Sequence, residues 1–281
     1  MSAIATTYEV REPAIAVPAA RTSKPRLHPE TPNVFVVPAF NEIDNLPRLL
    51  ADFEGRPELF PVGSRLIVVD DGSSDGTPQW LAAYDGCVPT QLIAFDENRG
   101  PGAAFRAGFE AALAACPADA NIVTLEADTT SDLNALHEML AEVDAGAGLV
   151  LASVHGGGRM VNVSFLRRFL SKCAGRAVRL LLGIDARTVS SFFRVYRASV
   201  MRQAVAQYGD GLITESGFAC KAELLAKIAA LGTPIEEVPV DLDGAQRVGE
   251  SKMRLGPTFA GYWRLFRAPK LADEHGGSAT R

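Results

Sequence analysis

Two carboxylates close an apolar run near the middle of the chain. In NIVTLEADTTSDL, residues 121–133, Glu126 and Asp128 follow a run of strand-forming residues. Hard divalent cations prefer oxygen ligands, and two carboxylates one residue apart at a strand end both reach forward from the edge of a sheet. The alternative is that Asp128 caps a helix beginning near Ser131, although Ser131 and Asp132 can fill that role themselves. The pair therefore either holds a cation or caps a helix.

A second acidic pair follows another apolar run. In IVVDDGSSDGT, residues 67–77, Asp70 and Asp71 come directly after the apolar residues, and Gly72 permits a tight turn. An ordinary corner between a strand and a helix needs only one such acid. Two adjacent carboxylates at a buried strand end repel each other, so this pair requires hydrogen-bond donors nearby. A nucleotide base and ribose would supply them.

These acids need strands to position them, and the first half of the sequence alternates short β-rich runs with segments of helical period. Strands are predicted at 33–40, 65–72, 90–95, 121–128 and 147–154, and helices at 42–54, 75–85, 100–116 and 131–144. The strands are continuously apolar, which predicts an α/β fold with a largely parallel sheet and helices on both faces. Ligands bind beyond the carboxyl ends of such strands. The segments PAFNE, DDGSSDGT and EAD should therefore converge on one crevice.

The second half is more helical and more basic. Helices are predicted at 164–183 and 218–232, and one more strand at 235–240. On the first of these helices Arg168, Lys172, Arg176 and Arg179 share one face, and Arg167 and Ser171 form a second pair beside them. Such a basic stripe is either a solvated surface or an anion site.

The composition excludes several classes of protein. The chain has 281 residues, 47% of them hydrophobic, which is sufficient for a sizeable core. With 28 basic and 33 acidic residues the net charge is −5, so no nucleic acid partner is expected. The four cysteines form no CxxC pair and the four histidines no metal-binding spacing, which argues against zinc sites, disulfide frameworks and histidine triads.

The ends of the chain carry no membrane-spanning signal. Residues 1–32 lack the apolar core of a signal peptide, so we expect a flexible leader. No run of about 18 uncharged apolar residues is present, and we expect a cytoplasmic protein. The segment 256–270 mixes aromatic and basic residues and either packs on the core or rests on a membrane surface. We expect at most peripheral association with the inner membrane face.

The segments VVPAFNE, IVVDDGSSDGT, ENRGPGAAFRAGF and LEAD, in this order and spacing, resemble the nucleotide-binding half of glycosyltransferase family 2, which has the GT-A fold. The resemblance runs from about Val34 to Met253 and is close to the dolichyl-phosphate mannosyltransferase, or polyprenyl-phosphate glycosyltransferase, branch. Together with the composition of the two ends, it predicts a flexible leader at 1–32, a GT-A catalytic domain at 33–255, and an amphipathic C-terminal segment and polar tail at 256–281. The GxGxxG motif of a dinucleotide-binding dehydrogenase is absent after the first strand.

The resemblance also implies a donor site. It assigns nucleotide binding to Pro38, Phe40, Glu42, Asp70, Asp71, Arg99, Gly100, Glu126 and Ala127. Within that set Asp71 is expected to hydrogen-bond the base and Arg99 to lie near the phosphates, while Phe40 stands where the family usually has Tyr. The implied cofactor is Mg²⁺ or Mn²⁺, held against the diphosphate by Glu126, Asp128 and Thr130, the last at a position often filled by Gln.

The acceptor side follows from the same resemblance. Members of the branch grip the acceptor phosphate with residues at the Arg167 and Ser171 spacing, and QRVGESKM, with Arg247, Ser251 and Lys252, is similar to an Arg-Gly-Ser-Lys signature. The implied catalytic set is Asp128, Arg167, Ser171, Arg247 and Lys252. The sequence departs from the family pattern at Thr188, where Asp is usual, at Phe192, where Gly is usual, and at Val154, where Arg is usual although Arg159 is close by.

The reaction that these expectations imply is metal-dependent transfer of a hexose, with inversion, from GDP-mannose or a UDP-sugar to a polyprenyl phosphate of the dolichyl type. A phosphate acceptor is already ionised and needs no general base, whereas an alcohol would, with Glu215 and Glu223 as distant candidates. Two alternatives remain. One keeps the donor but uses a soluble small-molecule acceptor, and the other is a catalytically silent sugar-nucleotide-binding protein, which only Glu126 supports.

Overall fold

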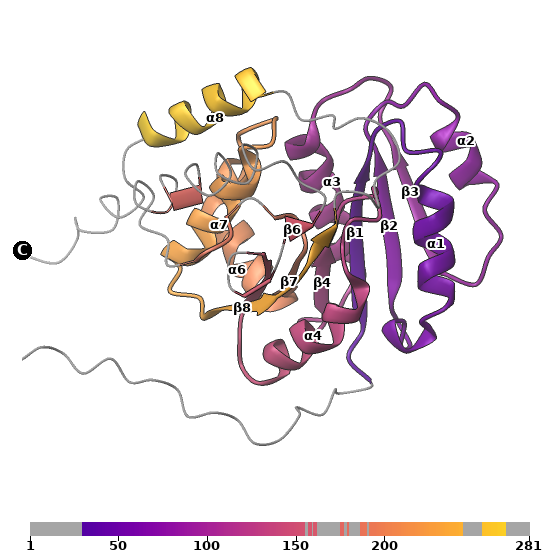
Figure 1. Cartoon of the computed structure of the whole chain (residues 1–281), viewed down its shortest axis with the longest axis horizontal. Helices are drawn as coiled ribbons and strands as arrows, with labels where there is room; N and C mark the ends of the chain where they lie inside the picture. The colour runs from indigo at the N-terminus through magenta and orange to yellow at the C-terminus, as the bar shows by residue number, and fades with distance from the viewer. Residues whose placement is uncertain are drawn as a thin grey trace, which may run out of the picture.

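The computed structural model describes residues 30–154, 157–158, 160–161, 175–176, 179, 186–189, 191–243 and 255–267. Within them a central β-sheet is covered by helices on both faces (Figure 1). The α/β architecture predicted from the apolar strands is confirmed.

The central sheet has seven strands in the order β3-β2-β1-β4-β7-β5-β8. The strands are β1 (Asn33–Ala39), β2 (Arg65–Asp70), β3 (Thr90–Ala94), β4 (Asn121–Thr124), β5 (Leu149–Ser153), β7 (Arg194–Arg197) and β8 (Ile235–Pro239). All neighbours pair in parallel except β7, which is antiparallel to both β4 and β5. Two short strands, β6 (Met160–Val161) and β9 (Leu242–Asp243), form a separate parallel pair.

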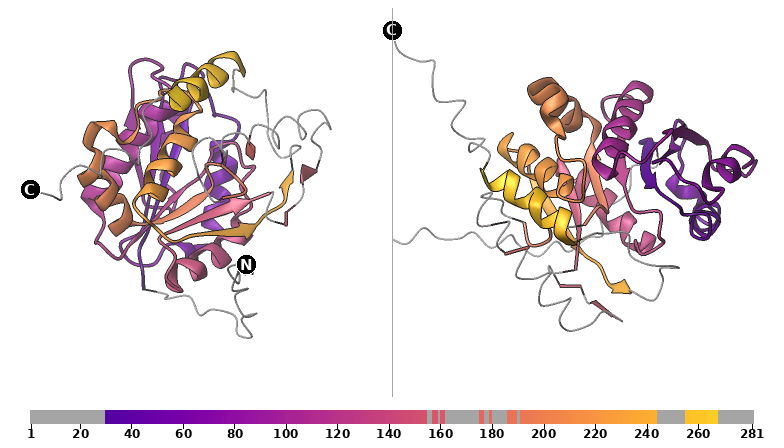
Figure 2. Two further views of the ribbon diagram at one scale, coloured as in Figure 1. Left: turned by 90° about the vertical axis from the view of Figure 1, so that its left-hand side faces the viewer. Right: turned by 90° about the horizontal axis from the view of Figure 1, so that it is seen from above.

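The helices form a layer on each face of the sheet (Figure 2). They are α1 (Leu46–Glu54), α2 (Thr77–Ala82), α3 (Pro101–Ala115), α4 (Leu136–Asp144), α6 (Ala198–Tyr208), α7 (Cys220–Ala230) and α8 (Leu255–Arg267), with short 3-10 turns η1 (Pro57–Leu59), η2 (Leu133–Ala135) and η3 (Gly209–Leu212). Helices α1 and α4 cover one face, α3, α6 and α7 cover the other, and α8 packs on α7. No helix among the described residues is long and apolar enough to cross a membrane.

Alternate residues of each strand build the two cores. On β1, Val34 and Val36 pack on the α3 side, while Phe35 and Val37 pack on the α1 side. The ring of Phe35 lies 4.8 Å from that of Phe53 on α1. Burial on both faces explains why these strands are continuously apolar in sequence.

Several predicted elements differ from the observed ones. The strand predicted at 121–128 ends at Thr124, so both Glu126 and Asp128 lie in the segment that follows it. The helix predicted at 42–54 begins at Leu46, because residues 42–45 form a turn in which the amide of Asn45 donates to the carbonyl of Glu42. The helix predicted at 131–144 is divided into η2 and α4. Strand β7 was not predicted. Of the helix predicted at 164–183, only 175–176 and 179 are among the described residues, and they are helical.

Candidate active site

The acidic segments of the sequence follow adjacent strands. Strands β1, β2 and β4 are parallel neighbours, so their carboxyl ends lie at the same edge of the sheet, as predicted. The loops after β1 and β2 are cross-linked there, because the amide of Asn41 donates to Ser73 Oγ (2.8 Å) and the amide of Glu42 to Thr77 Oγ1 (3.0 Å). These bonds hold Asn41 in the left-handed region at φ +53°. These hydrogen bonds join the loops after β1 and β2 into one continuous surface at this edge of the sheet, called the rim below.

Asp71 anchors the loop that leads into α3. It is buried, and its two carboxylate oxygens accept hydrogen bonds from the amides of Arg99 (2.7 Å) and Gly100 (2.9 Å). Burial raises the pKa of Asp71 above its usual value of 3.8, although the two amide donors act in the opposite direction. Each carboxylate oxygen of Asp71 can still accept a second hydrogen bond, so these two bonds leave room for the predicted contact with a base. That contact stays a prediction.

Asp70 has other hydrogen-bond partners than the adjacent Asp71. It is 1% exposed, and its Oδ2 accepts from the amide of Ser73 at 3.1 Å. Its Oδ1 is buried and has no hydrogen-bond partner among the described residues. An unsatisfied buried acceptor is uncommon in a folded protein and marks this pair as more than a turn between a strand and a helix.

The start of α3 packs against the backbone of residues 215–216. The amide of Gly102 donates to the carbonyl of Ser216 at 2.8 Å. A Cβ at Gly100, which has φ +88°, would lie 2.5 Å from that same carbonyl oxygen, and a Cβ at Gly102 would overlap the carbonyl of Glu215. The glycines are therefore needed for close backbone packing as well as for the turn. The exposed Arg99, predicted to lie near the phosphates, places its guanidinium 4.8 Å from the ring centre of Phe95.

Asp128 is a buried carboxylate on the segment after β4. It is 4% exposed, and its Oδ1 accepts from both the amide (3.2 Å) and the hydroxyl (2.6 Å) of Thr130. The intervening Thr129 is in the left-handed region at φ +58°. The helix cap in this segment is Asp132, which accepts from the amide of Asn134, so the structure assigns the capping role to Asp132 and not to Asp128.

Glu126 has a cationic partner that the sequence did not indicate. The Nζ of Lys221, on α7, lies 3.6 Å from Glu126 Oε1, with the Glu126 side chain 34% exposed and that of Lys221 8% exposed. The same Nζ lies 3.9 Å from the ring centre of Phe192 and 5.1 Å from that of Phe218. Burial lowers the pKa of Lys221, and the Glu126 carboxylate opposes that shift. The one available signal in the sequence was a lysine inside the apolar run FACKAELL.

Phe192 explains part of this arrangement. Its ring packs 4.3 Å from that of Phe105 and supports the Lys221 ammonium, so the departure from Gly at this position places an aromatic face under a cation. A cavity of about 10 Å³ adjoins the pair and is lined in part by Phe192, Lys221 and Arg194. Thr188, the other departure, is buried and its hydroxyl hydrogen-bonds that of Ser153 at 2.8 Å.

The metal-binding side chains of this site fit a divalent cation only if a bound diphosphate supplies further oxygen ligands. Among the described residues no three His, Cys, Asp or Glu side chains form a metal-binding group. Besides the capping Asp132, the segment after β4 offers the carboxylates of Glu126 and Asp128, and the hydroxyl of Thr130 already donates to Asp128. Mg²⁺ is commonly held by one or two carboxylates plus phosphate oxygens and water. The residues present therefore fit a cation whose coordination a diphosphate completes.

The two glutamates considered as general bases have structural partners. Glu223 accepts from the amides of Thr214 and Glu215, both at 2.9 Å, and forms an ion pair with Lys227. The Glu215 carboxylate pairs with the guanidinium of Arg264 on α8. Both glutamates therefore hold the loop at 214–216 in place.

The predicted acceptor residues Arg167, Ser171, Arg247 and Lys252 lie outside the described residues, as do Ser251 and Arg159. Of the basic stripe, Arg176 is exposed and Arg179 half-buried. The acceptor site therefore stays a prediction.

Residues 34–204 match the model of the family described as Glycosyl transferase family 2. The chain belongs to this family. It is a glycosyltransferase, as the motifs predicted. The chain is 29% identical over 238 residues to polyprenol monophosphomannose synthase of Mycolicibacterium smegmatis, covering 81% of this chain and 83% of the relative. It is 31% identical over 226 residues to undecaprenyl-phosphate mannosyltransferase of Micrococcus luteus, covering 79% and 87%. These relatives confirm the resemblance to the polyprenyl-phosphate branch.

Solved structures confirm the GT-A fold of this glycosyltransferase. Glucosyl-3-phosphoglycerate synthase from Mycobacterium tuberculosis, in complex with Mn²⁺, UDP and phosphoglyceric acid, superposes with a TM-score of 0.57 at 17% identity, covering 85% of this chain and 80% of that one. Residues 1–349 of S. aureus TarS, in complex with UDP-GlcNAc, superpose with a TM-score of 0.56 at 17% identity, covering 84% and 65%. At these identities the likeness shows the fold alone.

Proposed function

We propose that this glycosyltransferase transfers a hexose from a nucleotide-diphosphate sugar, GDP-mannose or a UDP-sugar, to a polyprenyl phosphate, with Mg²⁺ or Mn²⁺ bound. The observation that carries the proposal is the buried Asp128, which follows β4, the parallel neighbour of β1, and is not used as a helix cap. The names of the Mycolicibacterium and Micrococcus relatives support the polyprenyl-phosphate acceptor.

The donor nucleotide would lie on the rim formed by the loops after β1 and β2. Asp71 holds the loop at Arg99 and Gly100 against this rim, and Asp70 supplies a second buried carboxylate. Pro38, Phe40 and Glu42 lie at the end of β1 on the same edge, which supports their assignment to the base and ribose. The diphosphate would then extend toward Asp128.

The chemistry is a single displacement. An oxygen of the ionised acceptor phosphate attacks the anomeric carbon, a new carbon–oxygen bond forms, and the bond to the nucleotide diphosphate breaks, with its electron pair leaving on the diphosphate. Asp128 and Glu126 would hold the divalent cation, which stabilises the charge on the departing diphosphate. A phosphate acceptor needs no general base. The engagement of Glu215 and Glu223 in structural pairs supports this acceptor class over an alcohol.

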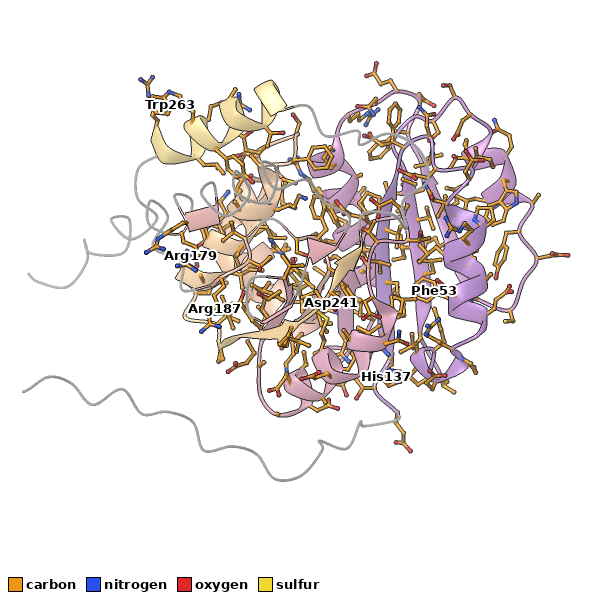
Figure 3. All side chains as sticks on the ribbon, in the orientation of Figure 1. Phe53, His137, Arg179, Arg187, Asp241 and Trp263 are labelled. Carbon is orange, nitrogen blue, oxygen red and sulfur yellow. The ribbon has the colours of Figure 1, made fainter. Side chains whose placement is uncertain are left out.

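Helix α8 supports contact with a membrane surface, where a polyprenyl acceptor resides. Trp263 is 58% exposed on the outer side of α8 (Figure 3), and the guanidinium of Arg267 lies 4.9 Å from its ring centre. Tyr262 and Leu265 instead pack on the core. One side of α8 is thus bound to the protein while an aromatic and basic side faces outward, which suits peripheral association.

The test is a transfer assay with the full-length protein and radiolabelled GDP-mannose or UDP-glucose. Undecaprenyl phosphate in detergent micelles and 3-phosphoglycerate in solution are compared as acceptors, with Mn²⁺ and with EDTA. We expect a lipid-extractable product that requires Mn²⁺ and is lost in Asp128→Asn. The matched control Asp132→Asn, which alters the cap of η2, should retain transfer. Product on the soluble acceptor alone, or equal transfer in EDTA, would reject the proposal.

A further inference from the structure

The ion pair between Glu126 and Lys221 joins the segment after β4 to α7. Lys221 lies in the first turn of α7, and its ammonium is enclosed by the rings of Phe192 and Phe218 with the Glu126 carboxylate 3.6 Å away. Both ring faces and the carboxylate favour a positive charge at this point. The ammonium is thus built into the protein beside one of the two carboxylates that would bind a metal.

A fixed ammonium and a divalent cation compete for the same carboxylate. Glu126 is the partly exposed member of the pair and Lys221 the buried one, so the ammonium is held in place while the carboxylate stays partly accessible to solvent. A metal that approached Glu126 would meet the repulsion of a positive charge in a poorly solvated position, where screening is weak. The carboxylate of Asp128 instead accepts hydrogen bonds from the amide and the hydroxyl of Thr130.

We propose that Lys221 is a positioning residue that draws Glu126 toward α7 and lowers the affinity of the donor site for a divalent cation, so that the metal depends on Asp128 and on the nucleotide diphosphate. This inference rests on the proposed metal-dependent function. Its consequence is an order of binding, because the free protein holds the metal weakly and the metal arrives with the nucleotide.

The experiment measures Mn²⁺ binding directly and does not depend on transfer. Free Mn²⁺ is followed by electron paramagnetic resonance, without nucleotide and with saturating GDP or UDP. The variants are Lys221→Gln, Lys221→Met and the charge-conserving Lys221→Arg, each also combined with Glu126→Gln. Arg267→Gln is the control, since it removes one exposed positive charge on α8 and leaves the pair intact. Thermal melting identifies any variant that does not fold.

We expect Lys221→Gln and Lys221→Met to bind Mn²⁺ about tenfold more tightly than the wild type, a typical size for coupling between two sites. Lys221→Arg and Arg267→Gln should resemble the wild type. In the Glu126→Gln background the gain should vanish, which a merely structural role for Lys221 would not produce.

Three outcomes would overturn the inference, and they are distinguishable. If the wild type binds Mn²⁺ with a nucleotide and neither neutral variant of Lys221 binds it more tightly, the inference alone is wrong. If no variant and no wild-type sample binds Mn²⁺ with GDP or UDP, the metal site of the proposed function is wrong, and the inference falls with it. A gain that persists in Glu126→Gln would also reject the role of Glu126.

Discussion

The carboxylate of Glu215 and the guanidinium of Arg264 form a two-point ion pair, with Nε to Oε1 at 2.8 Å and Nη2 to Oε2 at 2.5 Å. The Glu215 side chain is 7% exposed, whereas that of Arg264 is 61% exposed. The pair connects α8 to the loop whose Ser216 carbonyl accepts from Gly102 at the start of α3. Helix α8 is therefore linked, through this ion pair and the bond between Ser216 and Gly102, to the start of α3, directly after the loop that Asp71 holds.

Removing the arginine should loosen this connection. We expect Arg264→Ala to increase amide hydrogen exchange in α8 and in residues 214–216 and to weaken GDP or UDP binding, because the buried Glu215 carboxylate loses its charged partner. Arg267→Ala is the matched control, since Arg267 is exposed and stacks on Trp263 of the same helix. Equal exchange in the two variants would show that the ion pair does not couple α8 to the loop.

The glycine at the start of α3 should not tolerate a methyl group. A Cβ at Gly102 overlaps a backbone carbonyl that cannot move aside alone, so Gly102→Ala should lower the free energy of unfolding by about 2 kcal/mol. Gly217→Ala adds the same methyl where, apart from its two neighbours in the chain, no atom of the described residues lies within 4 Å, and it should have little effect. Urea unfolding of both variants measures the difference.

The hydrogen bonds of Thr130 should matter for the metal site. Its hydroxyl orients the Asp128 carboxylate at 2.6 Å, so Thr130→Val should weaken Mn²⁺-dependent nucleotide binding by about tenfold, the usual order for a partner of a metal ligand. Thr130→Ser keeps the hydroxyl and should bind as the wild type does. Calorimetric titration with GDP and UDP compares them, and a weakened Thr130→Ser variant would contradict the role of the hydroxyl.

Asp71 and Asp75 should respond to pH with opposite signs. The pKa of Asp71 is raised in the folded protein, so its contribution to stability is present below pH 3.8 and is lost as the pH rises through the folded pKa. For Asp75, burial raises the pKa but hydrogen bonds from Thr77 and the Ile43 amide outweigh it, so the pKa is lowered. The Asp75 contribution is present above pH 3.8 and is lost as the pH falls through the folded pKa.

Melting temperatures between pH 3 and pH 7 test this contrast. Relative to Asp71→Asn, the wild type should lose stability as the pH rises above 3.8. Relative to Asp75→Asn, it should gain stability as the pH rises toward 3.8. If the wild type's melting temperature changes with pH in the same direction relative to both variants, the opposite pKa shifts assigned to Asp71 and Asp75 are wrong.

The parallel part of the fold could be predicted from the sequence because a strand buried on both faces is a continuous apolar run. β1, β2 and β5 were found in this way, and the acids after β2 and β4 followed from the same pattern. β7 was missed because RVYR carries charges at both ends and resembles a surface segment. Its Arg194 is only 1% exposed and donates to the carbonyls of Val189 and Lys221, partners that exist only once the chain is folded.

The sequence by itself determined which carboxylates follow the carboxyl ends of the parallel strands, because parallel neighbours bring those ends to one edge of the sheet. Tertiary structure alone decided what those carboxylates face. Lys221 meets Glu126 and Arg264 meets Glu215 because α7 and α8 pack beside segments remote from them in the chain. Local composition encodes where a helix begins and which side is apolar, but a charge pair across such a contact depends on how the whole sheet and its helices are stacked.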